Sequence, residues 1–459
     1  MRTCPRGTRR IGHAAFATDN EAARDLDLDP MFSILLPSRD RLGLLKFALQ
    51  SVLAQGFDSL EIIVSDNASS EDYSGYISSL GDRRIKYLRS ERTLSVTENW
   101  NVALNAARGE YVLMLGDDDA LVPELLRQLR AIIEKEGRPT VIYMMAYHYM
   151  YPNVLSAQPD GSFLEVVNSE LFTRSDTTYW LDAKEAEFLA REAVSFHHKV
   201  SFNAQHFVWR RDFTTGHGDF FRDPYPDYFA CFYTFAKAKR ILVLPTASII
   251  VGIAKQSFGY FFFNNRQDEG AEKFAMAARS EEVWRRDQDL RMALDFAGTT
   301  HYRNWLLTSI RFQKEVDASF SIDVDLYCRI QIVESIADKV LKDAAADLAE
   351  EEWSSFKQFA LESWSAIRDA SNNQNGDRAV SIAVEKNRIL TQILGVYFPA
   401  EVRVLPLSGH SDIMDAFAFL ATQRRLKETA QSNNLTAGSD AKRSNFMRLV
   451  SVIGSRLCR

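Results

Sequence analysis

Two stretches, Phe32-Ser-Ile-Leu-Leu36 and Glu61-Ile-Ile-Val-Ser65, decide the fold together with the segment between them. Both are short apolar runs, and the second is rich in β-branched residues, which predicts two buried strands. Between them, Leu45, Leu49 and Val52 recur at helical spacing. A strand, a helix and a second strand in this order predict a βαβ unit, in which the helix joins two parallel strands and covers the sheet.

The same alternation of strand and helix patterns continues to about residue 150. We expect strands at 85–88, 110–115 and 140–146, and helices at 98–107 and from Pro123 through Ile133. Later expectations are a helix at 183–194, strands at 241–244 and 249–251, and a helix at 228–237. The pattern predicts an α/β domain with a mostly parallel sheet flanked by helices.

Composition divides the chain into four expected regions. Residues 1–30 lack an apolar period, which is typical of a disordered lead-in, and Met31 is a hypothetical natural start. The sheet domain is expected over 31–270. Long amphipathic segments with few turn residues predict a separate, mainly helical region over 271–437. Residues 438–459 form a basic amphipathic tail, which predicts either peripheral contact with an anionic membrane, an exposed helix or disorder.

Charge and composition exclude several classes of protein. The 459 residues carry a formal charge of −6 and are 46% hydrophobic, so neither a nucleic-acid partner nor a disordered chain is expected. Four scattered cysteines do not form a disulfide framework, which favours a reducing compartment. The most apolar stretch, 241–254, is interrupted by Pro245 and is shorter than the ~18 residues of a membrane-spanning helix. We therefore expect a cytoplasmic protein, peripheral to the inner face of the membrane if the tail binds lipid.

Three adjacent carboxylates, Asp117, Asp118 and Asp119, follow the apolar run that ends at Leu115. Adjacent acids at the end of a buried strand repel one another unless a cation or hydrogen-bond donors compensate for their charge. One interpretation is therefore a site for Mg²⁺ or Mn²⁺ with diphosphate oxygens. The other is a solvated turn that caps the next helix. Asp66, after the second strand, is equally open to a cap or a nucleotide contact.

The order of these motifs resembles glycosyltransferase family 2, whose members have a GT-A fold and invert the anomeric centre. The resemblance covers about residues 32–260. It rests on Ser33-Ile-Leu-Leu-Pro-Ser-Arg-Asp-Arg41, Leu49-Gln-Ser-Val-Leu-Ala-Gln55, Glu61-Ile-Ile-Val-Ser-Asp-Asn-Ala-Ser69, Asn101-Val-Ala-Leu-Asn-Ala-Ala-Arg-Gly-Glu-Tyr111 and Leu115-Gly-Asp-Asp-Asp119. It implies transfer of a sugar from a nucleotide-sugar donor, such as a UDP-sugar, to a hydroxyl of a glycan or a lipid-linked acceptor.

The resemblance also implies roles for individual residues. The substrate-binding residues implied are Pro37, Ser38, Arg39, Asp66, Asn101, Asp117 and Asp118. Within that set, the first three line the nucleoside pocket and Asp66 contacts the base. Asp117 and Asp119 are the implied ligands of a divalent cation, Mn²⁺ or Mg²⁺. Among the acids of the segment 219–229, Asp227 is the implied general base, because it directly precedes a helix, with an N-terminal helix charge as the alternative.

Two departures from the family pattern leave alternatives open. Gly116 stands where the commoner family form has an acid, and Lys255 lies near the position where many relatives have a histidine. A degenerate nucleotide-sugar-binding scaffold is therefore a second hypothesis. A sugar nucleotidyltransferase is a third, but its glycine-rich loop is missing, because no glycine occurs before Gly43 in the loop after the first strand. The aromatic run 258–264 predicts either core packing or an acceptor contact.

Overall fold

The computed structural model of the chain describes residues 29–154, 160–166, 169–216, 218–263 and 300–324. It also describes the short pieces 326–327, 330–331, 402–405, 413–414, 416–418 and 420. The expected lead-in up to residue 28, the tail 438–459 and most of the region 271–437 lie outside the described residues. The elements described below belong to one compact unit, Met1–Phe417.

Four parallel strands form the half of the sheet nearest the N-terminus. They are β1 (Phe32–Ser38), β2 (Leu60–Asp66), β3 (Ile85–Arg89) and β4 (Tyr111–Met114), in the spatial order β3-β2-β1-β4. The helices α1 (Leu42–Leu53), α2 (Tyr73–Leu80) and α3 (Val96–Asn105) connect them. Every residue of β1 and β2 is buried, as expected for strands that are covered on both faces. The predicted α/β fold is confirmed.

The other half of the sheet is mixed. Its strands are β5 (Ala120–Leu121), β6 (Val141–Met150), β7 (Ser162–Val166), β8 (Tyr179–Asp182), β9 (Phe207–Arg210), β10 (Arg240–Ile253) and β11 (Val402–Leu405). Strand β9 runs antiparallel to both β4 and β6, whereas β10 is parallel to β6. Among the described residues the sheet has 11 strands.

Strand β10 corrects the expectation of two separate strands at 241–244 and 249–251. It is one strand, and its pairing with β6 shifts register between Leu244 and Ala247 and again between Ala247 and Ile249. Pro245 lies in the first irregularity, where a residue without a backbone N–H is tolerated. Pro245, which interrupts the apolar stretch 241–254, therefore marks a bulge within one strand.

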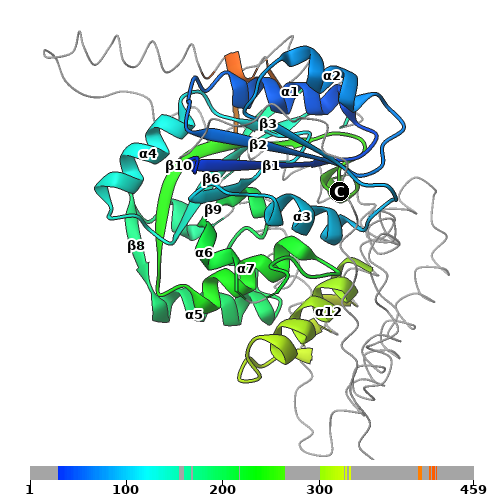
Figure 1. Cartoon of the computed structure of the whole chain (residues 1–459). Helices are drawn as coiled ribbons and strands as arrows, with labels where there is room; N and C mark the ends of the chain where they lie inside the picture. The colour runs from blue at the N-terminus through cyan, green and yellow to red at the C-terminus, as the bar shows by residue number, and fades with distance from the viewer. Residues whose placement is uncertain are drawn as a thin grey trace, which may run out of the picture. The chain divides into compact units, whose positions relative to one another are not determined.

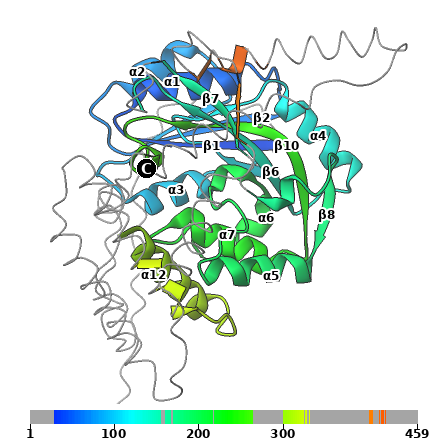
Figure 2. The same ribbon diagram turned by 180° about the vertical axis from the view of Figure 1, so that it is seen from behind.

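Helices cover both faces of the sheet (Figures 1 and 2). Helices α1 and α2 lie on one face, and α3 lies on the other with α7 (Pro226–Lys237) and α5 (Ala183–Val194). The remaining helices are α4 (Leu125–Lys135), α6 (Arg211–Thr214), α8 (Phe258–Phe263) and α12 (Thr300–Glu315), with short 3-10 turns at Glu170–Phe172 and Ala204–His206. Helix α4 begins after a left-handed Glu124, so Pro123 precedes its first turn and does not form part of it.

Helix α12 belongs to the core of the sheet domain, although it lies beyond the expected boundary at residue 270. Trp305 and Phe312 are fully buried in the same hydrophobic cluster as residues of α5, α7 and the sheet. Trp305 Nε1 donates a hydrogen bond of 3.0 Å to the Ala193 carbonyl of α5. The core therefore extends past residue 270. Within the described part of the chain, no helix is long and apolar enough to cross a membrane.

Candidate functional site

The carboxyl ends of β1, β2 and β4 bring the predicted polar residues to one edge of the sheet. Ser38, the last residue of β1, pairs in register with Asp66, the last residue of β2. The Ser38 hydroxyl donates a hydrogen bond of 2.6 Å to Asp117 Oδ2 in the turn after β4. Ser38 therefore links Asp66 to the acidic turn 116–119, as expected for loops at the carboxyl edge of parallel strands.

Asp66 is fully buried and its carboxylate is bound by groups of this chain. Oδ1 accepts a hydrogen bond from the Ser69 backbone N–H at 2.9 Å, and Oδ2 accepts from Tyr87 Oη at 2.6 Å. Arg89 Nη1 lies 2.5 Å from the same Oδ2, and the Arg89 side chain is 46% exposed. In this ion pair, the charged group that reaches solvent is therefore the guanidinium of Arg89, at the end of β3. Sequence reasoning did not find Tyr87 or Arg89.

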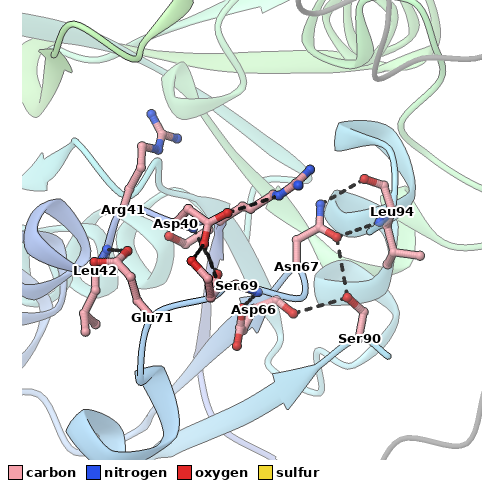
Figure 3. Close-up of polar contacts among 12 residues, drawn as sticks. Asp40, Arg41, Leu42, Asp66, Asn67, Ser69, Glu71, Ser90 and Leu94 are labelled. Carbon is pink, nitrogen blue, oxygen red and sulfur yellow. Dashed lines mark hydrogen bonds and ion pairs between the residues drawn. The ribbon is translucent and has the colours of Figure 1, made fainter. Parts of the chain in front are cut away.

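The loops after β1 and β2 are held in place by side chains that bind backbone groups (Figure 3). Asn67 donates to the Leu94 carbonyl at 2.9 Å and accepts from the Leu94 N–H at 2.7 Å. Asp40 Oδ1 accepts from the Ser70 N–H at 2.6 Å, and the Ser70 hydrogen bond lowers the pKa of the Asp40 carboxyl. In Figure 3, the Arg41 side chain extends away from these contacts. Arg39 is half-exposed beside Asp40.

Arg41 neutralises Asp117, the first acid of the turn. Its Nη2 lies 2.5 Å from Oδ1, and its Nε donates a hydrogen bond of 3.0 Å to Oδ2. Asp117 is fully buried, and burial raises the pKa of its carboxyl to about 6 although Arg41 opposes that shift. The motif that ends in Arg41 does not by itself reveal this ion pair. The available signal was a basic residue in the loop beside a strand that ends in three acids.

Asp119, the last acid of the turn, accepts hydrogen bonds on both oxygens. Oδ1 accepts from the Gly252 N–H, and Oδ2 accepts from the Gly116 N–H and from Gln205 Nε2, each at 2.8 Å. Burial raises the pKa of the Asp119 carboxyl to about 7, and the neighbouring Asp118 adds to the shift. These contacts give Asp119 the role of closing the turn onto β10.

Asp118, the middle acid, has the most open carboxylate of the three. Its Oδ2 accepts a hydrogen bond of 2.5 Å from the Ser257 hydroxyl, and Arg41 Nη1 lies 3.9 Å from the same atom. Within the described residues, no donor binds its Oδ1. Asp118 retains 7% exposure, against 0% for Asp117 and 1% for Asp119.

Two glycines allow the turn to close this tightly. A Cβ at Gly116 would lie 2.6 Å from Asp119 Oδ2 and 3.0 Å from Asp118 Oδ1. A Cβ at Gly252 would lie 1.7 Å from the Asp118 carbonyl oxygen. A side chain at position 116 would therefore displace the Asp119 carboxylate, and one at position 252 would displace the backbone of the turn.

The acids of the turn differ in how well they fit a divalent cation. No group of three or more His, Cys, Asp or Glu side chains in the described residues converges to hold a metal. Of the two implied ligands, Asp119 has protein donors on both oxygens. Asp117 Oδ2 accepts from Ser38 and Arg41, while its buried Oδ1 forms no hydrogen bond and lies in an ion pair with the Arg41 guanidinium. A cation would therefore have to displace Arg41 from Asp117 and backbone amides from Asp119. Asp118 fits, because Mg²⁺ is commonly bound through one carboxylate together with substrate phosphates.

Asp227 lies in the first turn of α7, and among the described residues no cationic side chain pairs with its carboxylate. Its Oδ1 accepts a hydrogen bond of 3.0 Å from the Tyr228 N–H, and burial raises the pKa of its carboxyl to about 7. The two other acids of this segment differ from it. Asp219 is exposed, and Asp223 forms an ion pair with Arg311 of α12. The raised pKa of Asp227 suits a general base near neutral pH.

Asn101, an implied substrate-binding residue, is buried in α3 and binds backbone groups. Its Nδ2 donates 2.9 Å hydrogen bonds to the carbonyls of Thr97 and Phe221, and its Oδ1 accepts from the Phe221 N–H at 3.1 Å. Asn101 thus holds the segment that leads to Asp227. Pro37, another implied substrate contact, is buried within β1.

Lys255, the described part of the aromatic run 258–264 and two histidines have ordinary structural surroundings. Lys255 is exposed in the turn after β10, and Phe258–Phe263 forms α8. His206 bonds the Met144 carbonyl at 2.7 Å through Nδ1, and burial lowers its pKa to about 4. The ring of His198 stacks on Phe202.

Comparison with known proteins identifies the part of the chain that holds the acidic turn. Residues 33–184 match the model of the family described as Glycosyl transferase family 2. This segment is a glycosyltransferase family 2 domain. It contains every predicted site residue except Asp227, which lies beyond its end.

Curated relatives of the family 2 domain include sugar-transferring proteins. One is the GalNAc(5)-diNAcBac-PP-undecaprenol beta-1,3-glucosyltransferase of Campylobacter jejuni, 37% identical over 124 residues, which are 24% of this chain and 40% of the relative. Another is the putative colanic acid biosynthesis glycosyl transferase WcaA of Escherichia coli, 30% identical over 133 residues, which are 28% of this chain and 47% of the relative. The chain thus spans less than half the length of each.

Solved structures similar to this chain include that of S. aureus TarS 1-349 in complex with UDP-GlcNAc. Its TM-score is 0.42 at 15% sequence identity, and the match covers 67% of this chain and 86% of that chain.

Proposed function

We propose that this chain is a nucleotide-sugar-dependent, inverting glycosyltransferase. The observation that carries the proposal is the edge formed by Asp66, Ser38 and the acidic turn 116–119 within a family 2 domain. Asp118 is the member of the turn with an open carboxylate oxygen, beside the cationic Arg41. This edge would hold the nucleoside diphosphate of the donor.

The leaving group is a diphosphate, and the residues of the turn suit its charge. A divalent cation, Mn²⁺ or Mg²⁺, bound by Asp118 would supply positive charge to the departing diphosphate. Arg41 forms an ion pair with Asp117 and so offsets its charge. With Asp118 bound to the cation, neither of these two acids would repel the diphosphate of the donor. The titratable Asp119 is held by backbone amides and Gln205, which fixes the geometry of the turn.

The acceptor hydroxyl needs a base, and Asp227 has suitable properties for that role. With a pKa of about 7, its carboxylate takes up the hydroxyl proton near neutral pH. The acceptor oxygen forms a bond to the anomeric carbon as the bond from that carbon to the diphosphate oxygen breaks. One displacement of this kind inverts the anomeric centre and requires no covalent intermediate on the protein.

The donor proposed is a UDP-sugar or another nucleotide sugar, and the acceptor is a hydroxyl of a glycan or of a lipid-linked glycan. The similarity to a C. jejuni protein named as a glucosyltransferase acting on an undecaprenol-linked glycan supports a sugar of hexose type and an acceptor of this class.

A panel of nucleotide sugars tests the proposal. We expect UDP-glucose, UDP-N-acetylglucosamine or GDP-mannose to raise the melting temperature, more in the presence of MnCl₂, because a ligand that binds the folded state stabilises it. A donor that binds with Mn²⁺ should also be hydrolysed slowly, because water can replace the acceptor hydroxyl, and this hydrolysis releases the nucleoside diphosphate. If none of the donors binds with or without Mn²⁺, the proposal is contradicted.

A catalytically degenerate scaffold is the second candidate, favoured by the occupied carboxylates of Asp117 and Asp119. It predicts that a donor raises the melting temperature while no nucleotide is released in the presence of any cation. Nucleotide release from a bound donor excludes the scaffold.

A further inference from the structure

The segment that leads to Asp227 starts at a buried polar contact and ends where α7 begins. At its start, the amide of Asn101 in α3 bonds both the N–H and the carbonyl of Phe221. At its end, the first turn of α7 begins at Pro226. Between these points the chain is bound by α12, a helix outside the family 2 match 33–184.

Two side chains of α12 bind the backbone of this segment. Thr308 Oγ1 accepts a hydrogen bond of 3.3 Å from the Tyr225 N–H, two residues before Asp227. Arg311 Nη1 donates to the Asp223 carbonyl at 3.1 Å and forms an ion pair with the Asp223 carboxylate. Thr308 is fully buried, and Arg311 is 19% exposed. Buried polar contacts whose groups are satisfied make the structure around them more rigid.

A third contact connects the segment to the acidic turn. His301 Nδ1 of α12 lies 3.1 Å from Tyr225 Oη, and the ring of Phe258 packs on both residues with centroids 6.0 Å and 5.8 Å away. Phe258 directly follows Ser257, whose hydroxyl binds Asp118. Asp118 and the segment before Asp227 are therefore joined through adjacent residues and one aromatic cluster.

We propose that α12 is a positioning element for Asp227, in which Thr308 and Arg311 hold the backbone at Tyr225 and Asp223 and so place the Asp227 carboxylate relative to the acidic turn. This inference rests on the proposed role of Asp227 as base. Packing of α12 needs only its apolar side chains, such as Trp305 and Phe312. The polar contacts of Thr308 and Arg311 are made to residues 223 and 225, directly before α7 begins at Pro226.

Two pairs of variants test the role of α12. Thr308→Val keeps the shape of the side chain and removes the acceptor for the Tyr225 N–H, whereas Thr308→Ser keeps the hydroxyl. Arg311→Gln removes the charge that holds Asp223, and its partial exposure makes it the safer change for folding. Arg311→Lys keeps the charge as the conservative partner. Each full-length variant is compared with wild type and Asp227→Asn. The assay measures the rate at which the donor is hydrolysed to nucleoside diphosphate, with MnCl₂ and the nucleotide sugar that raises the melting temperature most.

We expect Thr308→Val and Arg311→Gln to lower kcat about tenfold and to leave the donor KM within about twofold, because a misplaced base costs rate and not donor binding. The ascending limb of the pH profile should also move to lower pH, since a loosened Asp227 is more hydrated and its pKa falls. Cys231, one turn along α7, is the titratable neighbour whose own pKa Asp227 raises, and burial keeps it protonated in this range. Thr308→Ser and Arg311→Lys should restore most of the rate.

The outcomes separate this inference from the proposed function. If Asp227→Asn abolishes release while Thr308→Val and Arg311→Gln keep the wild-type kcat and pH profile, α12 has no positioning role. Equal losses in the conservative partners, with an unchanged pH profile, overturn it as well, because they indicate general destabilisation. If Asp227→Asn retains full release, or no donor is turned over by wild type, the proposed base fails and the inference fails with it. If Thr308→Val does not fold, the Arg311 pair decides.

Discussion

Arg41 and Asp117 form an ion pair between the loop after β1 and the turn after β4, with Nη2 2.5 Å from Oδ1 and Nε 3.0 Å from Oδ2. The Arg41 side chain is 25% exposed and Asp117 is fully buried. The pair therefore supplies the first acid of the turn with a cation from the protein itself. It also joins the two loops that would hold the two ends of a nucleoside diphosphate.

Removal of Arg41 should destabilise the fold strongly. Arg41→Met leaves Asp117 buried without a cationic partner, and breaking a buried pair in this way costs about 3 kcal/mol. We expect the free energy of unfolding in urea to fall by about that amount. Arg39→Met is the matched control, because Arg39 lies in the same loop but pairs with Asp40 at an exposed position, where a pair contributes less than about 1 kcal/mol. Equal effects of the two substitutions would contradict the role given to Arg41.

Asp227 should make stability depend on pH. Its pKa is about 7 in the folded state and about 3.9 in the unfolded chain, so the folded state binds the proton more tightly. As pH rises from about 4 to 7, the unfolded state ionises first and wild type loses stability relative to Asp227→Asn. Allowing for partial exposure of this side chain, we expect the difference to change by about 2 kcal/mol. Urea unfolding of both proteins at several pH values measures it, and a difference independent of pH would refute the raised pKa.

Gly252 should tolerate no side chain. Gly252→Ala places a Cβ 1.7 Å from the Asp118 carbonyl oxygen, so either β10 or the acidic turn must move. We expect the melting temperature to fall and donor-induced stabilisation to disappear. Gly43→Ala in α1 is the control, since a Cβ there meets nothing within 4 Å and alanine favours a helix. If donors stabilise Gly252→Ala as much as wild type, the turn is not rigidly held by β10.

The parallel half of the sheet could be predicted because its signals are local. Apolar runs of strand length alternate with helical spacing, and β2, expected at residues 61–65, runs from Leu60 to Asp66. The mixed half could not be predicted in the same way. Antiparallel strands β7 and β8 lie in aromatic and polar sequence without a long period, and their order in the sheet depends on pairing partners far along the chain.

In the site too, features encoded by a short motif could be predicted, whereas contacts between residues far apart in the sequence could not. Motif order placed Asp66 and the acidic turn at one edge of the sheet, and Ser38 joins them there. The sequence did not reveal which acid remains open, because Arg41 and Asp117 are 76 residues apart and Ser257 and Asp118 are 139 residues apart. The contacts of α12 with residues 223–225 were missed for the same reason.

The central claim, that Asp118 and a divalent cation together hold the donor diphosphate, is tested most directly by calorimetric titration of UDP with and without MnCl₂. For wild type, Mn²⁺ should raise the affinity for UDP at least tenfold. Asp118→Asn should lose that increase and keep the metal-free affinity, while Asp219→Asn, at an exposed position, should behave as wild type. An Asp118→Asn variant with the full Mn²⁺-dependent gain in affinity would contradict the account.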